Sequence, residues 1–317
     1  MSALVLSLDF ELFWGVAESA SISRYRNNVE GEWDAIPKML KLFRNYGIRA
    51  SWATVGMLMC RNYSQWRELK PPIMPRYVNK RCSTYSLDSV VRDNPKLFFA
   101  RPLVSQILET PGQEIASHSY SHFYCGEVGV TSGQFAADLV CARDIGAELG
   151  IEYQSFVFPR NQVIDSFLPE LHRAGYRVFR GNPDHWLHHD GHYVPYGLTG
   201  RGIRLMDAYF PISGQNIAKT SIAGGLVDLP ASLSLRPWSS RLSLLEPMRL
   251  SRMKRTMTAA AEADGVVHLW WHPHNFGVNT DENMAVLESL LHHYLRLRDK
   301  YGMSSAQMGD FATGALQ

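Results

Sequence analysis

Short apolar runs that alternate with amphipathic stretches are the feature of this 317-residue chain that most restricts its fold. Residues 3–8 and 50–55 are typical of buried strands, and residues 33–46 carry apolar side chains at helical spacing and end at Gly47. Further strands are predicted at 114–117, 155–158, 176–179, 226–229 and 266–271, and further helices at 97–108, 134–149, 166–174, 247–263 and 281–301. Strands that alternate with helices indicate parallel β/α units, so we expect an α/β fold.

Two long stretches interrupt this alternation. Residues 61–95 are rich in Pro, Arg and Tyr, and residues 181–225 are rich in Gly, His and aromatic side chains. The hydrophobic fraction of 45% is ordinary for a globular protein with a full core. We therefore expect one domain over residues 1–317, with both stretches as insertions that build a substrate site above the C-terminal ends of the strands.

Composition also restricts the partners and the location. A net charge of +2 argues against a nucleic-acid partner. No stretch reaches the ~18 uncharged apolar residues of a membrane span, and the first residues lack the basic region of a signal peptide. These features predict a cytoplasmic protein. None of the four cysteines (Cys60, Cys82, Cys125 and Cys141) forms a C-x-x-C pair, and that compartment favours free thiols over a Cys60–Cys82 disulfide.

Polar side chains able to do chemistry follow directly after the predicted strands. They are Asp9 and Glu11, then His118 and His122, then Arg160 and Asn161, and finally His272, His274 and Asn275. Because the strands are expected to be parallel, these groups converge at one end of the sheet, where such folds place their sites.

His118 and His122 have the spacing H-x-x-x-H. One helical turn or a tight loop puts both imidazoles on one side, where they can bind one metal ion. The chain has 12 histidines, so the spacing alone is a weak signal, and a surface pair at the start of a helix is the alternative.

Asp9 and Glu11 end an apolar strand and, two residues apart, point to the same side. Phe13 and Trp14 follow closely and indicate a partly buried place. Two buried like charges are costly unless a cation joins them, which favours a metal site over a solvated strand end.

His268, Trp270 and His272 alternate onto one face of the last predicted strand. We interpret His268 as a core histidine with a satisfied hydrogen bond. His272 precedes Pro273, which favours extended backbone at the strand end and so a fixed position for a general acid. A plain surface histidine is the alternative for His272.

Taken in order, these segments resemble the polysaccharide deacetylase family, carbohydrate esterase family four. The segments are residues 7–11 (SLDFE), 117–122 (SHSYSH), 156–159 (FVFP) and 270–273 (WWHP), together with residues 42–56 (LFRNYGIRASWATVG). The resemblance covers roughly residues 3–300. It implies a distorted (β/α)7 barrel, with the two stretches at 61–95 and 181–225 as insertions.

The resemblance also implies roles for the polar residues. Asp9 becomes the general base, Glu11, His118 and His122 bind one divalent metal ion, and His272 becomes the general acid. Nitrogen and oxygen ligands make Zn²⁺ the first expectation, with Co²⁺, Ni²⁺ or Mn²⁺ as alternatives. Many members have two adjacent aspartates in the first motif, whereas this chain has the spaced form Asp9-Phe10-Glu11.

Two further positions depart from the family pattern. Val157 stands where the family often has an arginine, and Arg160 is expected either to reach Asp9 from the other side or to bind substrate. The family's Asp and Trp motif has two candidates, Asp184-His185-Trp186 and residues 226–230. The residues expected to bind or orient substrate are Arg160, Asn161 (whose neighbouring backbone N–H would face an oxyanion), Trp14, Asp184, Trp186 and His274.

By resemblance, the reaction is hydrolysis of the acetamide of an N-acetylated amino sugar. The absence of an export signal favours a nucleotide-linked or lipid-linked precursor, although an oligosaccharide remains an option. Residues 241–255 carry five basic side chains that could contact an anionic membrane, with an ordinary solvated helix face as the alternative. Trp14 and Trp186 could stack on sugar rings, although core packing is the default for tryptophan.

Three other functions stay open at this stage. The same fold could hydrolyse a non-sugar amide such as a formamide or a cyclic imide. The chain could be a non-catalytic carbohydrate-binding relic, although Asp9, Glu11, His118, His122 and His272 are all present. Finally, Cys125 lies three residues after His122 and could close a purely structural metal site.

Overall fold

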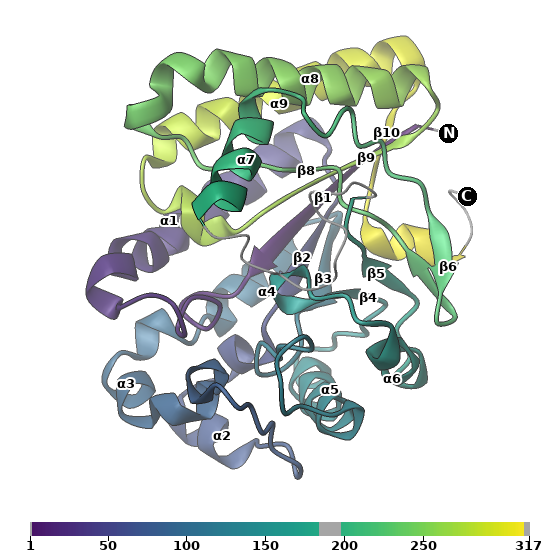
Figure 1. Cartoon of the computed structure of the whole chain (residues 1–317). Coiled ribbons are helices and arrows are strands. Elements are labelled where there is room, and N and C mark those ends of the chain that lie inside the picture. The colour runs from purple at the N-terminus through teal and green to yellow at the C-terminus, as the bar shows by residue number, and fades with distance from the viewer. Residues whose placement is uncertain (1, 184–197, 314–317) are drawn as a thin grey trace.

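A curled sheet of mostly parallel strands forms the centre of the structure (Figure 1). The computed structural model describes residues 2–183 and 198–313. In these ranges the strand order is β6-β7-β5-β4-β3-β2-β1-β9-β8, β10 pairs with β1, and β6 is antiparallel to β7. The strands are β1 (Ala3–Phe10), β2 (Ala50–Thr54), β3 (Gln113–Ser117), β4 (Ser155–Val157), β5 (Val178–Arg180), β6 (Ser221–Ala223), β7 (Leu226–Asp228), β8 (Leu233–Ser234), β9 (Val266–Trp271) and β10 (Ser304–Ala306).

One extended stretch, residues 226–235, joins the two sides of this sheet. Its first part, β7, pairs with β5, and its second part, β8, pairs with β9. Between them, the Ala231 N–H donates to the Gly181 carbonyl (2.9 Å) and the Ser232 N–H donates to the His268 carbonyl (2.7 Å). Pro230 has no N–H to donate, which explains why the strand is interrupted there. The wall of the barrel thus runs through β1, β2, β3, β4, β5, the β7–β8 stretch and β9, as the (β/α)7 expectation requires.

The two faces of the wall have different side chains. Along β1, the even-numbered residues from Leu4 to Phe10 pack outward against the helices. Ala3 and Val5 point inward and are followed on the same face by Ser7 and Asp9. The inner apolar cluster is made mostly of small side chains and is completed by Met308 and Phe311 (Ala3, Val5, Ala53, Ala116, Val157, Val178, Ala218, Val227, Leu229, Val266, Ala306). Along β1, the interior therefore changes from apolar to polar toward the C-terminal end of the strand.

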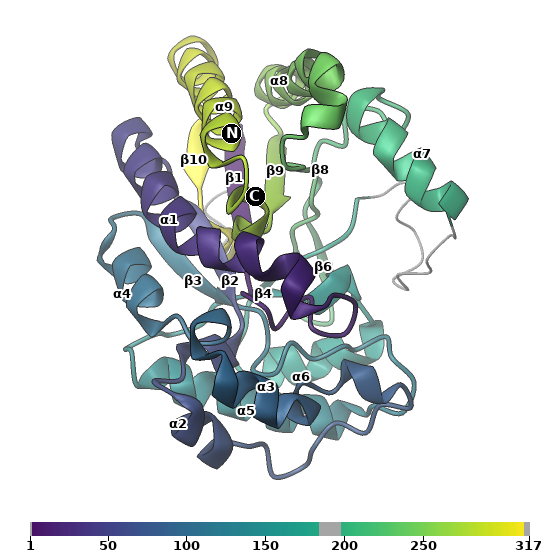
Figure 2. The same cartoon turned by 90° about the vertical axis from the view of Figure 1, so that its left-hand side faces the viewer.

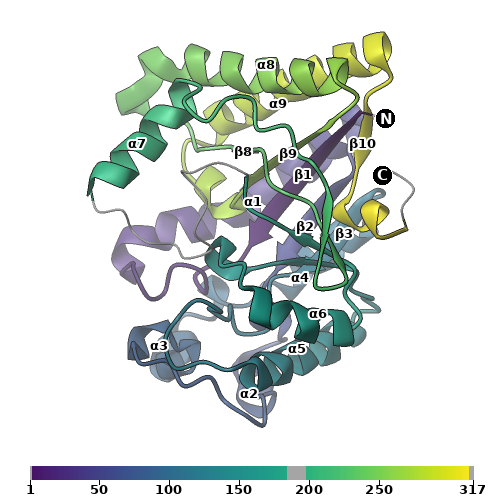
Figure 3. The ribbon, with the colours of Figure 1, turned by 45° about the vertical axis from the view of Figure 1, so that its right-hand side comes forward.

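Helices cover the outside of the wall (Figures 1–3). α8 and α9 lie side by side along β9 and β1, with α1 next to α9, and α5 and α6 lie together at the opposite side of the sheet. An aromatic cluster around Phe135 and Phe156 fills the space under α5 and α6. The helices are α1 (Ile22–Tyr46), α2 (Tyr63–Glu68), α3 (Asp88–Asp93), α4 (Arg101–Glu109), α5 (Ser132–Ala147), α6 (Leu168–Arg173), α7 (Leu198–Tyr209), α8 (Glu246–Glu262) and α9 (Thr280–Tyr301).

The alternation of strands and helices in the sequence predicts this order well, and the strand at 266–271 has the expected bounds. α1 begins at Ile22 rather than at residue 33, because its polar first turns pack against the loop after β9. The helix expected at 97–108 begins only at Arg101, after a short turn at Pro95–Leu97. The 61–95 stretch holds α2 and α3, and the described part of the 181–225 stretch holds α7 and β6.

The thiol prediction is confirmed, since all four cysteines lie in the described ranges and are free and buried. Among the described helices, none has the length and apolar character that a membrane crossing requires.

Candidate functional site

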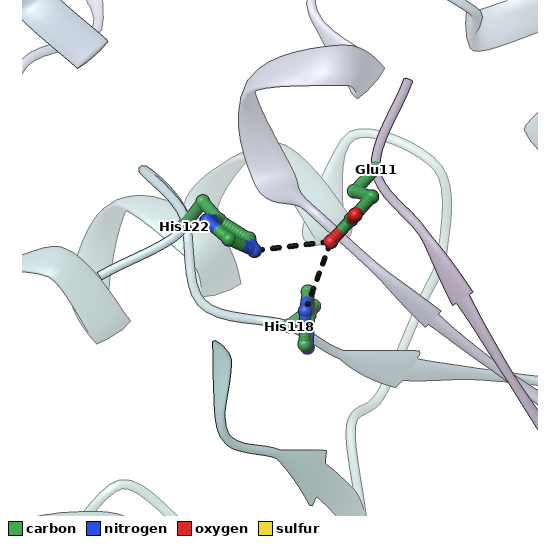
Figure 4. A group of neighbouring side chains, drawn as sticks. All are labelled: Glu11, His118 and His122. Carbon is green, nitrogen blue, oxygen red and sulfur yellow. Dashed lines mark ion pairs between the residues drawn. The ribbon is translucent and has the colours of Figure 1, made fainter. Parts of the chain in front are cut away.

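Glu11, His118 and His122 meet at the C-terminal end of the barrel (Figure 4). Glu11 follows β1, His118 follows β3, and His122 lies in the loop that leads to α5. The Glu11 Oε2 atom lies 3.5 Å from His118 Nε2 and 3.0 Å from His122 Nε2. One ligand atom from each residue lies within 4.8 Å of the other two, and all three side chains are buried. This convergence fits three ligands of one metal ion.

The surroundings of the two histidines fix how their rings can act. The His118 Nδ1–H donates to the Val157 carbonyl (2.8 Å), which leaves the Nε2 lone pair toward Glu11. His122 has no hydrogen-bond partner on Nδ1, and its ring is instead held edge-on against Tyr124, with 4.9 Å between ring centroids. Burial lowers the pKa of His122, so its ring is held in the neutral form that binds metals.

The loop that carries the histidines has strained backbone. Ser119 and His122 have φ values of 60° and 56°, a region that residues other than glycine seldom adopt. The buried carboxylate of Asp138 holds this loop by accepting from the backbone N–H groups of Tyr120 (2.7 Å) and Ser121 (3.1 Å). Such strain, held by specific bonds, is typical of functional sites.

Glu11 is held as a buried charge. Burial raises the pKa of its carboxyl, but His272, His118 and His122 outweigh burial and the pKa lies well below its usual value. A Cβ at Gly15 would overlap with the Glu11 carboxylate, so the turn after β1 requires glycine there. These residues fit a divalent metal: the donors converge, the pocket favours charge, and three protein ligands leave a position open for water or substrate.

Asp9 is held by Arg180, a residue that the sequence reasoning missed. The guanidinium donates from Nη1 to Asp9 Oδ1 and from Nη2 to Asp9 Oδ2, each at 2.7 Å, and also contacts Ser7 and Asn161. Burial raises the pKa of Asp9, but Arg180, with smaller contributions from nearby histidines, lowers it overall. The available signal was a charge at the end of the apolar strand β5, where Val178 and Arg180 share the inward face.

One of the two roles expected of Arg160 was contact with Asp9, and Arg180 makes that contact instead. Arg160 forms ion pairs with Glu18 and with Glu127 (3.0 Å), and its guanidinium stacks on the Tyr124 ring at 4.2 Å. The result is a link between the loops that follow β1, β3 and β4 at the edge of the site.

The Asn161 backbone N–H donates to the Phe158 carbonyl (2.8 Å), and the neighbouring Gln162 N–H donates to the Pro159 carbonyl (3.2 Å), so neither of these two groups is free to bind an oxyanion. The Asn161 side-chain oxygen accepts from Arg180 (2.8 Å), which makes Asn161 a residue that positions Arg180.

The two histidines after β9 lie on the other side of Glu11. His272 Nε2 is 3.4 Å from Glu11 Oε1 and 3.8 Å from Asp9 Oδ2, and its side chain is 28% exposed. His274 is buried, packs edge-on against Tyr25 and lies 3.9 Å from Glu11 Oε1, and burial lowers its pKa to about 3. His272 is thus the accessible imidazole of the group, and His274 lines its base.

The remaining expected substrate contacts are not in the site as described. Trp14 is buried and donates to the Phe98 carbonyl (2.8 Å), so it packs in the core rather than stacking on a sugar. Asp184 and Trp186 lie outside the described residues. The rival position, Asp228, is on the outward face of β7, because Val227 and Leu229 point into the barrel.

The structure also bears on Cys125 as a metal ligand and on residues 241–255 as a basic surface. Cys125 packs in the aromatic cluster with Phe123 and Phe135, and the metal-type group found among the described residues does not include it. In the 241–255 stretch, Arg249 and Arg252 are buried and paired with Glu246 and Asp207, which leaves fewer basic side chains on the surface than the sequence suggests.

Comparison with solved structures places the fold. No family model and no curated protein matches the sequence. A Mycobacterium smegmatis protein assigned to the polysaccharide deacetylases is similar at a TM-score of 0.60 and 13% identity, over 99% of this chain and 90% of that one. A Pseudomonas aeruginosa protein with the same assignment has a TM-score of 0.52 and 14% identity, over 98% and 89%. PuuE allantoinase has a TM-score of 0.53 and 13% identity, over 98% and 88%.

The chain therefore has the fold of the polysaccharide deacetylases, as its motifs suggest. Within that fold, the buried Glu11–His118–His122 group is the part of the described chain that could hold a metal ion.

Proposed function

We propose that the protein is a metal-dependent hydrolase that removes the acetyl group from an N-acetylated amino sugar. The observation that carries this proposal is the meeting of three groups at one end of the barrel: the Glu11–His118–His122 set, the ionised Asp9 and the accessible His272. A divalent ion held by the three ligands would lower the pKa of water and polarise an amide carbonyl. Zn²⁺ suits two imidazoles and a carboxylate, as do Co²⁺, Ni²⁺ and Mn²⁺.

Asp9 acts as the general base in this proposal. Because Arg180 binds both carboxylate oxygens, Asp9 has one orientation and stays ionised at neutral pH. It takes a proton from the water that attacks the acetamide carbon. The proton acceptor is thus positioned before the substrate arrives, which lowers the entropic part of the activation free energy.

His272 acts as the general acid. Its Nε2 lies close to both Asp9 and Glu11, and its partial exposure gives a substrate access to it. When the carbon–nitrogen bond breaks, a proton from His272 goes to the leaving amine. The products are acetate and a free amino sugar. Asp9 then passes its proton to His272 or to solvent, which restores the starting state of the site.

The proposed substrate class rests on the fold and on the motifs. Solved neighbours assigned to the polysaccharide deacetylases support an acetylated sugar, in a nucleotide-linked or lipid-linked precursor or an oligosaccharide. Peripheral membrane contact would follow if the sugar is lipid-linked. A cytoplasmic location and the lack of a nucleic-acid partner remain part of this proposal.

A non-sugar amide is the second candidate, because a neighbour of comparable similarity carries the name allantoinase. A non-catalytic carbohydrate-binding relic is the third.

The test measures metal content and acetate release together. We expect about one divalent ion per chain in the wild type and in Cys125→Ala, and loss of the ion in His118→Ala. The zinc-loaded protein is then offered N-acetylated sugar nucleotides, lipid-linked N-acetyl sugars, chitin oligosaccharides and allantoin. Acetate released from a sugar supports the proposal, hydrolysis of allantoin supports the second candidate, and sugar binding with no reaction supports the relic. Absence of metal binding after incubation with zinc would contradict the mechanism.

A further inference from the structure

A buried chain of hydrogen bonds extends from Asp9 into the barrel. Arg180 Nη1 donates to Ser7 Oγ (2.9 Å), and Ser7 Oγ lies 2.8 Å from His268 Nε2. Arg180, Ser7 and His268 are each fully buried. They come from three strands, β5, β1 and β9, so the chain crosses the inside of the barrel.

The terminal N–H groups of Arg180 are all used in this chain. Two bind Asp9, one binds Ser7 and one binds Asn161. Arginine cannot accept, so Ser7 accepts from it, and Ser7 then either donates its hydroxyl proton to His268 Nε2 or accepts a second hydrogen bond from it. In both arrangements the His268 ring is neutral. Burial lowers the pKa of His268 to about 3, which agrees with a neutral ring.

The far end of the chain is attached to the stretch that closes the barrel. The His268 N–H donates to Ser232 Oγ (3.0 Å), and the His268 carbonyl accepts from the Ser232 N–H (2.7 Å). Ser232 belongs to residues 226–235, which join β5 to β9. Arg180 is also fixed by the Trp270 ring, whose centroid lies 4.5 Å from the guanidinium carbon.

Core packing alone does not require polar side chains at the buried positions of Ser7 and His268. The neighbouring inward positions are small apolar side chains such as Val5 and Val178, and polar groups buried among them are costly without complete partners. Ser7, which is bonded to His268, accepts the terminal Arg180 N–H that binds neither Asp9 nor Asn161. Without them, the guanidinium could tilt and bind Asp9 through one oxygen.

We propose that Ser7 and His268 are positioning residues that act through Arg180 to hold the Asp9 carboxylate in its bidentate orientation. This inference rests on the proposed role of Asp9 as general base. It assigns a function to the buried residues behind the reaction site rather than to those that touch substrate.

The first experiment needs no substrate. ¹⁵N NMR of the histidine rings and arginine side chains is recorded for the wild type, Ser7→Ala and Ser155→Ala. Ser155 is a matched control, since it is buried in the same barrel and donates to Glu114 (2.6 Å) without touching Arg180. We expect a neutral His268 and restricted Arg180 N–H signals in the wild type and in Ser155→Ala. Ser7→Ala should shift the His268 Nε2 signal and average the Arg180 signals. Unchanged Arg180 signals in Ser7→Ala would overturn the proposal, whichever ring nitrogen of His268 carries the proton.

The second experiment measures kcat and KM with the substrate that the acetate assay identifies. We expect Ser7→Ala and His268→Met to lower kcat about ten- to hundredfold, the range seen for supporting hydrogen bonds, with KM and zinc content unchanged. His268→Gln keeps an acceptor near the position of Nε2 and should recover much of that loss. If all three variants keep wild-type kcat and differ only in melting temperature, the role is structural and the proposal is wrong. If the wild type hydrolyses nothing, the proposed function fails, while the NMR result still decides whether the chain orients Arg180.

Discussion

Two glutamates at opposite ends of the barrel, Glu11 buried and Glu114 half-buried, show how the same side chain is used in different ways. Glu11 lies after β1 at the C-terminal end, and Glu114 lies at the start of β3 at the N-terminal end. Glu114 accepts from Ser51 and Ser155 (each 2.6 Å) and from the Gly309 N–H (3.1 Å), yet burial still raises its pKa. Imidazoles surround Glu11, and its pKa is lowered. Hydroxyl and amide donors hold the Glu114 side chain in place, whereas imidazoles around Glu11 favour its ionised form. Only an ionised carboxylate suits a bound cation.

The pair of substitutions Glu11→Gln and Glu114→Gln gives the largest contrast. We expect Glu11→Gln to lose its metal ion and to lower kcat/KM about a thousandfold or more, because a catalytic ion supplies several kcal/mol of transition-state stabilisation. Glu114→Gln should keep metal and activity. Metal analysis and acetate release measure both. Equal activity losses in the two variants would contradict a functional difference between the C-terminal and N-terminal ends of the barrel.

Arg180→Met should reduce stability more than any change at the Glu114 end. It leaves Asp9 buried without its cation, which costs about 3–5 kcal/mol of unfolding free energy. The double variant Asp9→Asn/Arg180→Met should recover much of this loss, since the buried charge is then gone. Urea unfolding of the wild type and both variants checks this, and a double variant no more stable than Arg180→Met would show that Asp9 is not the cause.

Gly15→Ala should weaken metal binding without changing a ligand. The added Cβ overlaps with the Glu11 carboxylate and must displace it, so we expect about a ten- to hundredfold weaker affinity, as for other displaced ligands. Gly133→Ala, where the Cβ meets open space, is the control. Zinc titration with a competing chelator distinguishes them, and equal affinities would mean that Glu11 moves at no cost.

Stability against pH should show opposite slopes for the two glutamates in metal-free protein. Glu114 has a raised folded pKa, so it holds its proton longer when folded, and its contribution falls as pH rises above about 4.3, the ordinary value for glutamate. Glu11 has a lowered folded pKa, so its contribution is present above about 4.3 and is lost as pH falls through the folded value. Relative to wild type, Glu114→Gln should therefore gain stability as pH rises above about 4.3, and Glu11→Gln should lose stability as pH rises toward about 4.3 from below. Parallel curves for the two variants would contradict the assigned directions.

The sequence predicts the metal group because it depends on a general property of parallel sheets. Glu11, His118 and His122 follow their strands directly, so the meeting of strand ends brings them together without further knowledge. His268 is likewise confirmed as a core histidine, since alternation along β9 places it inside the barrel with its Nε2 bonded to Ser7.

Arg180 and Trp14 show where sequence reasoning stops. Local pattern places Arg180 at the end of a strand but does not say which neighbouring strand carries its partner, and Asp9 is far away in sequence. Trp14 follows the charged pair closely, but the turn after β1 directs its ring into the core beside Phe98. Both depend on tertiary packing, which a single sequence does not encode locally.

The pairing of β10 with β1 bears on how the molecule forms during synthesis. Ala3 lies beside Ser304, and the small-residue interior is sealed by Met308 and Phe311, among the last residues described. A ribosome adds roughly 5–20 residues each second, so the inner wall stays open to water until β10, Met308 and Phe311 have been made. A nascent chain of this kind exposes its barrel lining until these residues are available to pack. Premature termination before β10 would therefore leave an aggregation-prone fragment with its metal ligands already made but no sealed interior to hold them.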